Sequence, residues 1–194
     1  MKQPDAIRRQ LNESAAVIAG LETVVSDIDA VINVVLETLD AGGTIYTCGN
    51  GGSAAEALHL AEELIGCYRD RQRPALRAVC LNADPTTLTC IANDFGYEQV
   101  FARQCEALLR PGDALVVLST SGNSPNLVHA LEHARSLDAH TLGFLGRTGG
   151  RCRPLCDQAV CVPSDTGAHV QEAHLVLVHL ICECVEGWVG VRER

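Results

Sequence analysis

The sequence predicts an α/β fold: a doubly wound, five-stranded parallel sheet with an N-terminal helical extension. Two patterns indicate it. After residue 43, short β-rich runs alternate with helical stretches, and runs such as 114–118 are apolar at every position, as in strands covered on both faces. The length of 194 residues fits one domain, so we expect a single unit over residues 1–194. Residues 1–42 would form the helical extension and 43–194 the α/β core.

The extension is predicted to be helical over residues 5–41. Apolar residues recur there at intervals of three and four, from Ile7 to Leu39, and Gly42-Gly43 ends the pattern. A break near Ser26-Asp27, which suits an N-cap, would divide the stretch into two helices. The apolar seam could pack on the domain or on another subunit, and the pattern leaves both open.

The core is predicted to contain five strands, at residues 44–48, 77–81, 114–119, 141–145 and 158–162. Helices are predicted between and after them, at residues 54–66, 98–109, 125–137 and 170–188. In this class of fold, ligands bind beyond the carboxyl ends of the strands. The segments that follow the first and third strands are therefore the first candidates for a site.

Charge and composition exclude some functions. The formal net charge of −9 disfavours a nucleic-acid or anionic-membrane surface, because both require clustered Lys and Arg. No apolar run reaches the roughly 20 residues of a membrane helix, and the polar start is not a signal peptide. We therefore expect a cytoplasmic protein with no membrane and no nucleic-acid partner.

The ten cysteines are expected to be small buried hydrophobic residues rather than disulfides. Those in apolar stretches are Cys48, Cys80, Cys90, Cys161, Cys182 and Cys184. Cys152, Cys156 and Cys161 loosely resemble a thiolate metal site. Their spacings of four and five are not those of a paired Cys-x-x-Cys motif, which makes this the less favoured alternative.

Two loops have the composition of anion sites. Gly49-Asn50-Gly51-Gly52-Ser53 leads from the first strand into a helix, whose free N–H groups favour an anion, although a tight structural turn is the alternative. Ser119-Thr120-Ser121-Gly122-Asn123-Ser124 follows the third strand and precedes Pro125. Ser124 alone would be an N-cap, but three further hydroxyl residues exceed what capping requires. Together the loops indicate a phosphorylated ligand.

Candidate acid–base residues lie on two predicted helices. His59 and Glu63 are four residues apart, so both point from one helix face, and they suit a metal or an acid–base pair. Gln171 and His179 lean to one side of the last helix, whereas His174 points elsewhere. The alternatives are a solvated helix face for the first pair and a hydrogen-bonded core residue for His179.

These motifs carry a resemblance to a known family. Cys48-Gly-Asn-Gly-Gly-Ser53, His59-Leu-Ala-Glu-Glu63-Leu, Ala92-Asn-Asp94-Phe-Gly, Ser119-Thr-Ser-Gly-Asn-Ser124 and Gln171-Glu-Ala-His are similar to the sedoheptulose 7-phosphate isomerase (phosphoheptose isomerase) family of sugar isomerase (SIS) domains. The match covers nearly the whole chain. The hydroxyl-rich loop is shared by all SIS domains, whereas the combination of His59, Glu63, Gln171 and His179 is more specific to the isomerase.

The resemblance implies a flavodoxin-like SIS fold and a homotetramer whose active sites lie between subunits. It implies a sugar-phosphate substrate, whose phosphate would be held by Ser53, Ser119, Thr120, Ser121 and Ser124. Further substrate contacts would come from Asn50, Gly51, Gly52, Asp94 and Gln171. It also implies one zinc ion per subunit, bound by His59, Glu63, Gln171 and His179.

The implied reaction converts D-sedoheptulose 7-phosphate to D-glycero-D-manno-heptose 7-phosphate through an enediol. A proton moves between C1 and C2, so a base is needed beside the carbon acid and an acid or metal at the oxygens. Glu63 is expected to be the base, and His179 to open the ring or move the hydroxyl proton. A carboxylate and an imidazole that bind zinc are not simultaneously free for proton transfer, so zinc either exchanges ligands or marks a resting state.

Two other functions stay open. A related SIS family, the regulator that binds the replication initiator DnaA, also has Ser-Ala-Ala after the glycine loop, as at Ser53-Ala54-Ala55. That regulator lacks part of the acid–base set that this chain has complete. The third alternative is a phosphosugar-binding sensor, or an isomerase of another phosphosugar, since the loops alone would permit either.

The chain departs from the family pattern at two places. Cys67 stands where members often have a substrate-directed arginine, and Arg69, Arg71 and Arg73 are candidates to replace it. The segment 166–170 before Gln171 also differs, with His169 in place of an arginine. The contacts to the sugar hydroxyls are therefore less defined than those to the phosphate.

Overall fold

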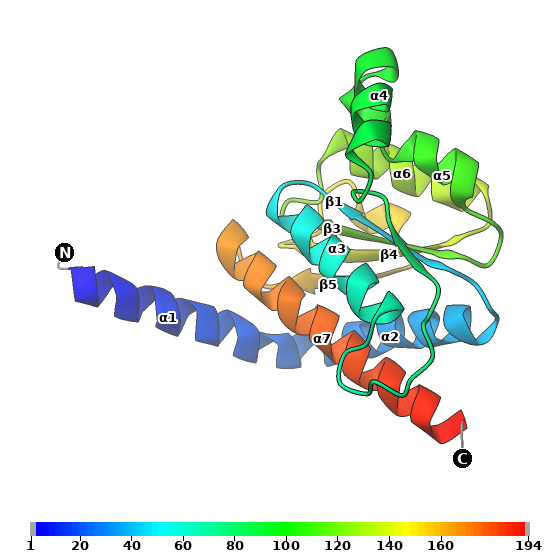
Figure 1. The fold of residues 1–194 in the computed structure, drawn as a ribbon. Helices are drawn as coiled ribbons and strands as arrows, with labels where there is room; N and C mark the ends of the chain where they lie inside the picture. Colours follow the sequence, from blue (N-terminus) through cyan, green and yellow to red (C-terminus); the bar gives the residue numbers. More distant parts are fainter. Residues whose placement is uncertain (1–2, 193–194) are drawn as a thin grey trace.

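A computed structural model describes residues 3–192 and contains a five-stranded, fully parallel sheet (Figure 1). The strand order is β2-β1-β3-β4-β5, which confirms the predicted doubly wound class. The strands are β1 (Ile45–Gly49), β2 (Ala78–Cys80), β3 (Ala114–Ser119), β4 (His140–Gly146) and β5 (Gln158–Val162). Each lies within one or two residues of its predicted position, because continuous apolar runs bounded by turn residues mark buried strands.

The order of strands reverses at β1 and β3, and this point determines where the two candidate loops lie. Cys48 pairs with Val117 and Gly49 with Leu118, so both strands end side by side at the same edge. All six residues of β3 are buried, as expected for the centre of the sheet. The loops after β1 and β3 therefore meet at the edge where doubly wound folds bind ligands.

Helices cover both faces of the sheet. One face packs against α2 (Val25–Asp40), α3 (Gly52–Ile65) and α7 (Gly167–Arg192), with a core that includes Leu60, Leu64 and Val178. The other packs against α5 (Ala102–Leu108) and α6 (Pro125–Ser136), with Phe101 and Leu127 in its core. The helix α7 lies beside α3 (Figure 1), so the two helices that carry the acid–base candidates are neighbours.

The N-terminal extension differs in detail from the prediction. It consists of α1 (Gln3–Gly20), the 3₁₀ turn η1 (Leu21–Val24) and α2. The predicted division into two helices is confirmed, with the break at residues 21–24. The N-cap of α2 is Val24, without a side-chain capping bond, so the predicted cap at Ser26-Asp27 was wrong. Leu21, in the 3₁₀ turn between the two helices, is buried. None of residues 3–20 is buried, and α1 runs out from the body of the protein (Figure 1).

One helix of the structure was not predicted, and another is shorter than predicted. The helix α4 (Pro85–Phe95) follows β2 and projects from the sheet (Figure 1). Asp84 caps it by accepting from Thr86 N–H, and Pro85 occupies its first turn, so the local signal was present. The predicted helix at 98–109 is divided into the 3₁₀ turn η2 (Tyr97–Gln99) and α5.

The cysteine predictions hold only in part. Cys48, Cys80 and Cys182 are buried, as expected, and burial raises the pKa of the Cys182 thiol to about 12. Cys90 and Cys184 are exposed, so the prediction that they are buried was wrong. Each lies in an apolar helical stretch, but on the side of its helix that faces away from the core. Among residues 3–192, every cysteine is free and no cysteine belongs to a possible metal cluster.

The last helix also bears on the membrane prediction. Within the described chain, α7 is the helix that is long and apolar enough to cross a membrane, with a mean hydropathy of 1.5 over an 18-residue window within Gly167–Val191. Its side chains Ala173, Leu177 and Ile181 are buried in the core on the sheet. Core packing accounts for part of its apolar composition, since 39% of that window is buried while Leu175 and Leu180 are exposed. Length and composition alone are weak evidence for a membrane span.

Candidate active site

The glycine loop (residues 49–53) connects β1 to α3. Ser53 lies in the first turn of α3 and is 3% exposed, and its N–H donates to Asn50 O. A Cβ at Gly52 would clash with the side-chain amide of Gln171, so glycine lets α7 approach the start of α3 closely. The first predicted anion loop is thus in contact with one of the predicted residues of α7.

The hydroxyl loop (residues 119–124) connects β3 to α6. Gly122 has φ +63°, and its N–H donates to Ser119 Oγ at 3.0 Å. Ser124 occupies the N-cap of α6, but within the described chain its hydroxyl makes no capping bond. That hydroxyl therefore remains available to a ligand at the N-terminus of a twelve-residue helix, where the helix dipole favours an anion.

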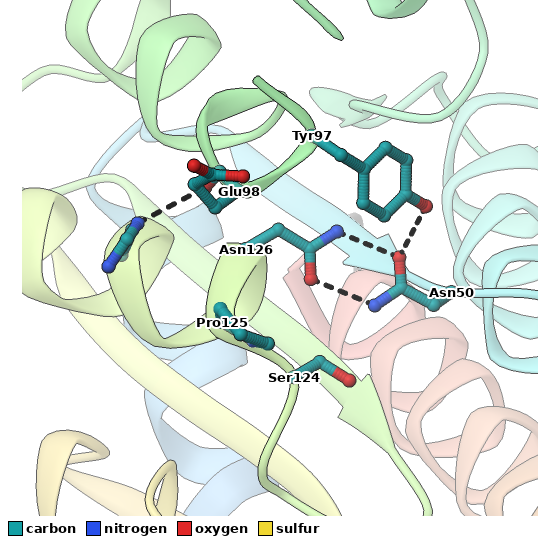
Figure 2. A pocket seen from close by; sticks show the side chains of 7 residues that line it. Asn50, Tyr97, Glu98, Ser124, Pro125 and Asn126 are labelled. Atoms are coloured by element: carbon teal, nitrogen blue, oxygen red, sulfur yellow. Dashed lines mark hydrogen bonds between the residues drawn. The ribbon is translucent and has the colours of Figure 1, made fainter. Parts of the chain in front are cut away.

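A side-chain amide pair joins the two loops. Asn50 Nδ2 donates to Asn126 Oδ1 and Asn126 Nδ2 donates to Asn50 Oδ1, both at 2.9 Å (Figure 2). The Tyr97 hydroxyl also donates to Asn50 Oδ1, and these residues line a cavity of about 460 Å³ together with Ser124. Asn126 and Tyr97 were not predicted. Neither lies in a predicted loop, and their partner is distant in sequence.

The acid–base cluster (His59, Glu63 and His179) brings together residues of α3 and α7. His59 Nε2 lies 3.1 Å from Glu63 Oε1, and the ligand atoms of all three residues lie within 4.8 Å of one another. The His59 and His179 rings meet edge to face, with centroids 5.3 Å apart. The Glu63 side chain is 14% exposed and that of His59 34%, so the cluster is half-buried but open to solvent. Two imidazoles and a carboxylate at this separation could hold a metal ion.

The other two candidates on α7, Gln171 and His174, lie at different positions along the helix and contact different parts of α3. Gln171 precedes His179 by two helical turns and lies against Gly52, at the glycine loop. His174 is fully buried, and its Nδ1 lies 3.6 Å from Glu56 Oε2 on α3. Neither ring nitrogen of His174 has a hydrogen-bond partner among residues 3–192. As predicted, His174 does not face the acid–base cluster.

The chain is similar to known proteins over most of its length. Residues 11–146 match the SIS domain family. Phosphoheptose isomerase of Akkermansia muciniphila is 46% identical over 180 residues, covering 93% of this chain and 95% of the relative. That of Helicobacter pylori is 46% identical over 176 residues, covering 91% of each. The structure of phosphoheptose isomerase from Neisseria gonorrhoeae superimposes with a TM-score of 0.90 at 36% identity, covering 96% of this chain and 100% of that one.

The chain belongs to the phosphoheptose isomerase family of SIS-domain proteins. Its departures from the family pattern now have a structural description. Cys67, at the position of the family arginine, follows the end of α3 and is half-buried. Arg73 is buried and bonded to backbone carbonyls, so it does not replace that arginine. Arg69 pairs with Glu183, at 2.6 Å, on the outer side of α7.

The structure also places two further positions identified from the sequence, Asp94 and His169. Asp94 lies on the projecting helix α4, exposed, and the side chains that contact it are those of Asn93 and Cys90. Among residues 3–192, its side-chain hydrogen bonds are with these two neighbours and not with the acid–base cluster. His169, in place of the family arginine, is buried, and its Nε2 lies 3.3 Å from Gln10 Oε1 of α1. His169 therefore fastens α1 to the start of α7.

Proposed function

We propose that this protein is an aldose–ketose isomerase that converts D-sedoheptulose 7-phosphate to D-glycero-D-manno-heptose 7-phosphate through an enediol. The acid–base cluster carries the proposal. Its carboxylate lies on the same helix that begins at the glycine loop, roughly two to three turns further along. A ligand whose phosphate lies at the loops can therefore extend its other end toward Glu63. The names of the relatives support this substrate.

The phosphate end of the sugar would be held by hydroxyl and backbone N–H donors of the two loops. We assign this role to Ser53, Ser119, Thr120, Ser121 and Ser124, with Asn50, Gly51, Gly52 and Gln171 contacting the rest of the substrate. Binding energy from the phosphate then orients the reacting carbons. The unused hydroxyl of Ser124 supports this assignment, since a purely structural N-cap would bond its own helix.

In the proposed mechanism, Glu63 removes the proton from the carbon next to the carbonyl and returns it to the neighbouring carbon. His179 donates and accepts the hydroxyl proton, or assists ring opening. The close approach of His59 to Glu63 orients the carboxylate, since its Nε2 is at hydrogen-bond distance from Oε1. Partial burial favours these transfers because water competes less for the reacting groups.

We also propose one zinc ion per subunit, with His59, Glu63 and His179 as the ligands that this chain brings together. Gln171, the fourth ligand implied by the resemblance, lies two helical turns from His179 against Gly52 and does not join the other three in this arrangement. The two imidazoles and the carboxylate within 4.8 Å fit zinc, which prefers nitrogen and oxygen donors in a compact set. When bound, zinc would polarise the carbonyl oxygen of the substrate. Glu63 and His179 carry protons only while they are not acting as metal ligands.

The proposed assembly is a cytoplasmic homotetramer with active sites between subunits, in which residues 1–42 pack as helices and the chain forms a single domain. The packing of subunits against one another is supported by large apolar side chains that are exposed on α7 and on α1 and α3, which both contact α7. These side chains are Ile7, Leu11, Ile18, Leu58, Ile65, Leu175 and Leu180. Asp94, exposed on α4, would then serve a site completed by another subunit.

The test is an NMR time course with sedoheptulose 7-phosphate in heavy water, with and without a zinc chelator. We expect aldose signals to appear together with deuterium at C2, as an enediol intermediate requires. The chelator arm shows whether zinc assists. No exchange in either arm, with a folded protein, would reject the enzyme and favour the alternatives, a DnaA-binding regulator or a phosphosugar sensor.

A further inference from the structure

Arg73 caps the end of α3 from the following loop. Its side chain is 2% exposed, although arginine is rarely buried without partners. Nη2 donates to Glu63 O at 2.6 Å, and Nη1 donates to Leu64 O at 3.0 Å and to Pro74 O at 2.8 Å. The last carbonyls of a helix have no partner within it, so a buried guanidinium at this point satisfies them.

Glu186 fastens the same loop to α7. Its carboxylate accepts from the backbone N–H groups of Tyr68, Arg69 and Asp70 at 2.9–3.2 Å. It also lies 3.5 Å from Arg73 Nε. Hydrogen bonds to a charged acceptor are stronger than neutral ones, and a carboxylate with several such donors holds the loop firmly. Arg73 and Glu186, here called the clamp, thus connect the end of α3 with α7.

Both proposed proton carriers are in contact with this arrangement. Arg73 bonds to the backbone carbonyl of Glu63 itself. Tyr68, whose N–H is held by Glu186, stacks on His179 with ring centroids 5.8 Å apart and an interplanar angle of 26°. The clamp therefore restrains Glu63 through its backbone carbonyl and His179 through the ring of Tyr68. A need for stability does not by itself explain this buried charged pair, because well-packed apolar residues of similar volume often stabilise a protein as much.

We propose that Arg73 and Glu186 are positioning residues that hold Glu63 and His179 at the separation needed for metal binding and proton transfer. They touch neither substrate nor metal in this proposal and act through the backbone of Glu63 and the ring of Tyr68. The inference rests on the proposed function for its catalytic part. Its metal-binding part can be measured independently of turnover.

The main variant is Arg73→Met, which keeps much of the apolar stem and removes the donors. We expect kcat to fall about 10- to 100-fold, as for other residues that orient ligating or reacting groups. KM for sedoheptulose 7-phosphate should change less than about threefold, since the loops are intact. Titration of the apoprotein with Co²⁺ should show affinity weakened about tenfold or more, with an altered visible spectrum.

Two further variants keep the test decisive. Arg110→Met is the matched control, because Arg110 Nη1 also donates to carbonyls at a helix end, those of Leu109 and Ala107, but on the opposite face of the sheet. It should leave kcat and Co²⁺ affinity within about twofold of the unaltered protein. If Arg73→Met does not fold, Glu186→Gln replaces it, with a smaller loss expected in the same two quantities.

The outcomes separate this inference from the proposed function. A folded Arg73→Met protein with unchanged kcat and Co²⁺ affinity, whatever its melting temperature, would make the clamp merely structural and overturn the proposal. The same holds for Glu186→Gln if that variant is the one tested. Weakened Co²⁺ binding in a protein that has no isomerase activity even when unaltered would reject the function but support the positioning role.

Discussion

The two anion loops and the acid–base cluster serve one proposed site but are built in different ways. Each loop is a continuous segment that connects a strand to the helix after it, so one short stretch of sequence specifies it. The cluster requires α3 and α7 to pack in one register, because Glu63 and His179 come from helices that are neighbours in space but more than 100 residues apart in sequence. The loops are therefore specified locally, although distant contacts such as that of Gly122 with Gly149 hold them in place. The cluster does not exist without the packing of α7 on α3.

The largest effect is expected at the cluster. Glu63→Gln keeps the shape of the side chain and removes its basicity, so kcat should fall by about 10²–10⁴-fold, the usual contribution of a general base. Sedoheptulose 7-phosphate should still bind, because the loops are unaffected. Deuterium exchange and equilibrium binding measure the two effects separately. Turnover near that of the unaltered protein would remove Glu63 from the role of base.

The next effect concerns the geometry of the hydroxyl loop. Gly122→Ala adds a Cβ at φ +63° and directs it onto the backbone carbonyl of Gly149, so the free energy of unfolding should fall by about 2–4 kcal/mol. Urea denaturation measures this. Gly112→Ala is the control, since Gly112 has φ +85° but no atom within 4 Å of its Cβ position. That variant should lose only about 1–2 kcal/mol. Equal losses would show that the contact with Gly149 is unimportant.

A smaller effect distinguishes binding from capping. Ser124→Ala should raise KM about tenfold through the loss of one bond to a charged phosphate, with the free energy of unfolding changed by less than about 0.5 kcal/mol. Asp84→Ala is the counterpart, because Asp84 accepts from Thr86 N–H and Thr87 Oγ1 at the start of α4. It should lose about 1 kcal/mol of stability and keep its KM. The reverse pattern would make Ser124 a structural cap.

The smallest effect is a pH dependence of the clamp. Desolvation raises the pKa of Glu186, but the N–H donors of residues 68–70 and Arg73 outweigh it and hold that pKa below its usual 4.5. A depressed carboxyl pKa stabilises the fold above the unfolded value, and this stabilisation is lost as pH falls through the folded value. The stability difference between unaltered protein and Glu186→Gln should thus shrink between pH 7 and pH 3.5 in urea titrations. A constant difference would exclude a charge effect.

Much of this protein was determined by local sequence. Apolar strands, loops rich in Gly and Ser, and the i, i+4 spacing of His59 and Glu63 all lie within short windows, so their positions were predicted closely. Asp84-Pro85 is also a local signal, for the start of α4. The break between the N-terminal helices was predicted within a few residues, but its cap was wrong. Cys90 and Cys184 were wrongly predicted to be buried, because burial of a residue in an apolar stretch depends on which helix face packs on the core.

Tertiary structure decided the rest, because it depends on which helix faces come into contact. The sequence marked His179 as a candidate, but its distance from Glu63 follows from the packing of α7 on α3. Arg73 was one of three arginines that could face a substrate, and only the fold shows it turned inward to the carbonyls of α3. Long-range pairs leave no pattern in a single sequence, since the residues that make them are independent in spacing and meet only after folding.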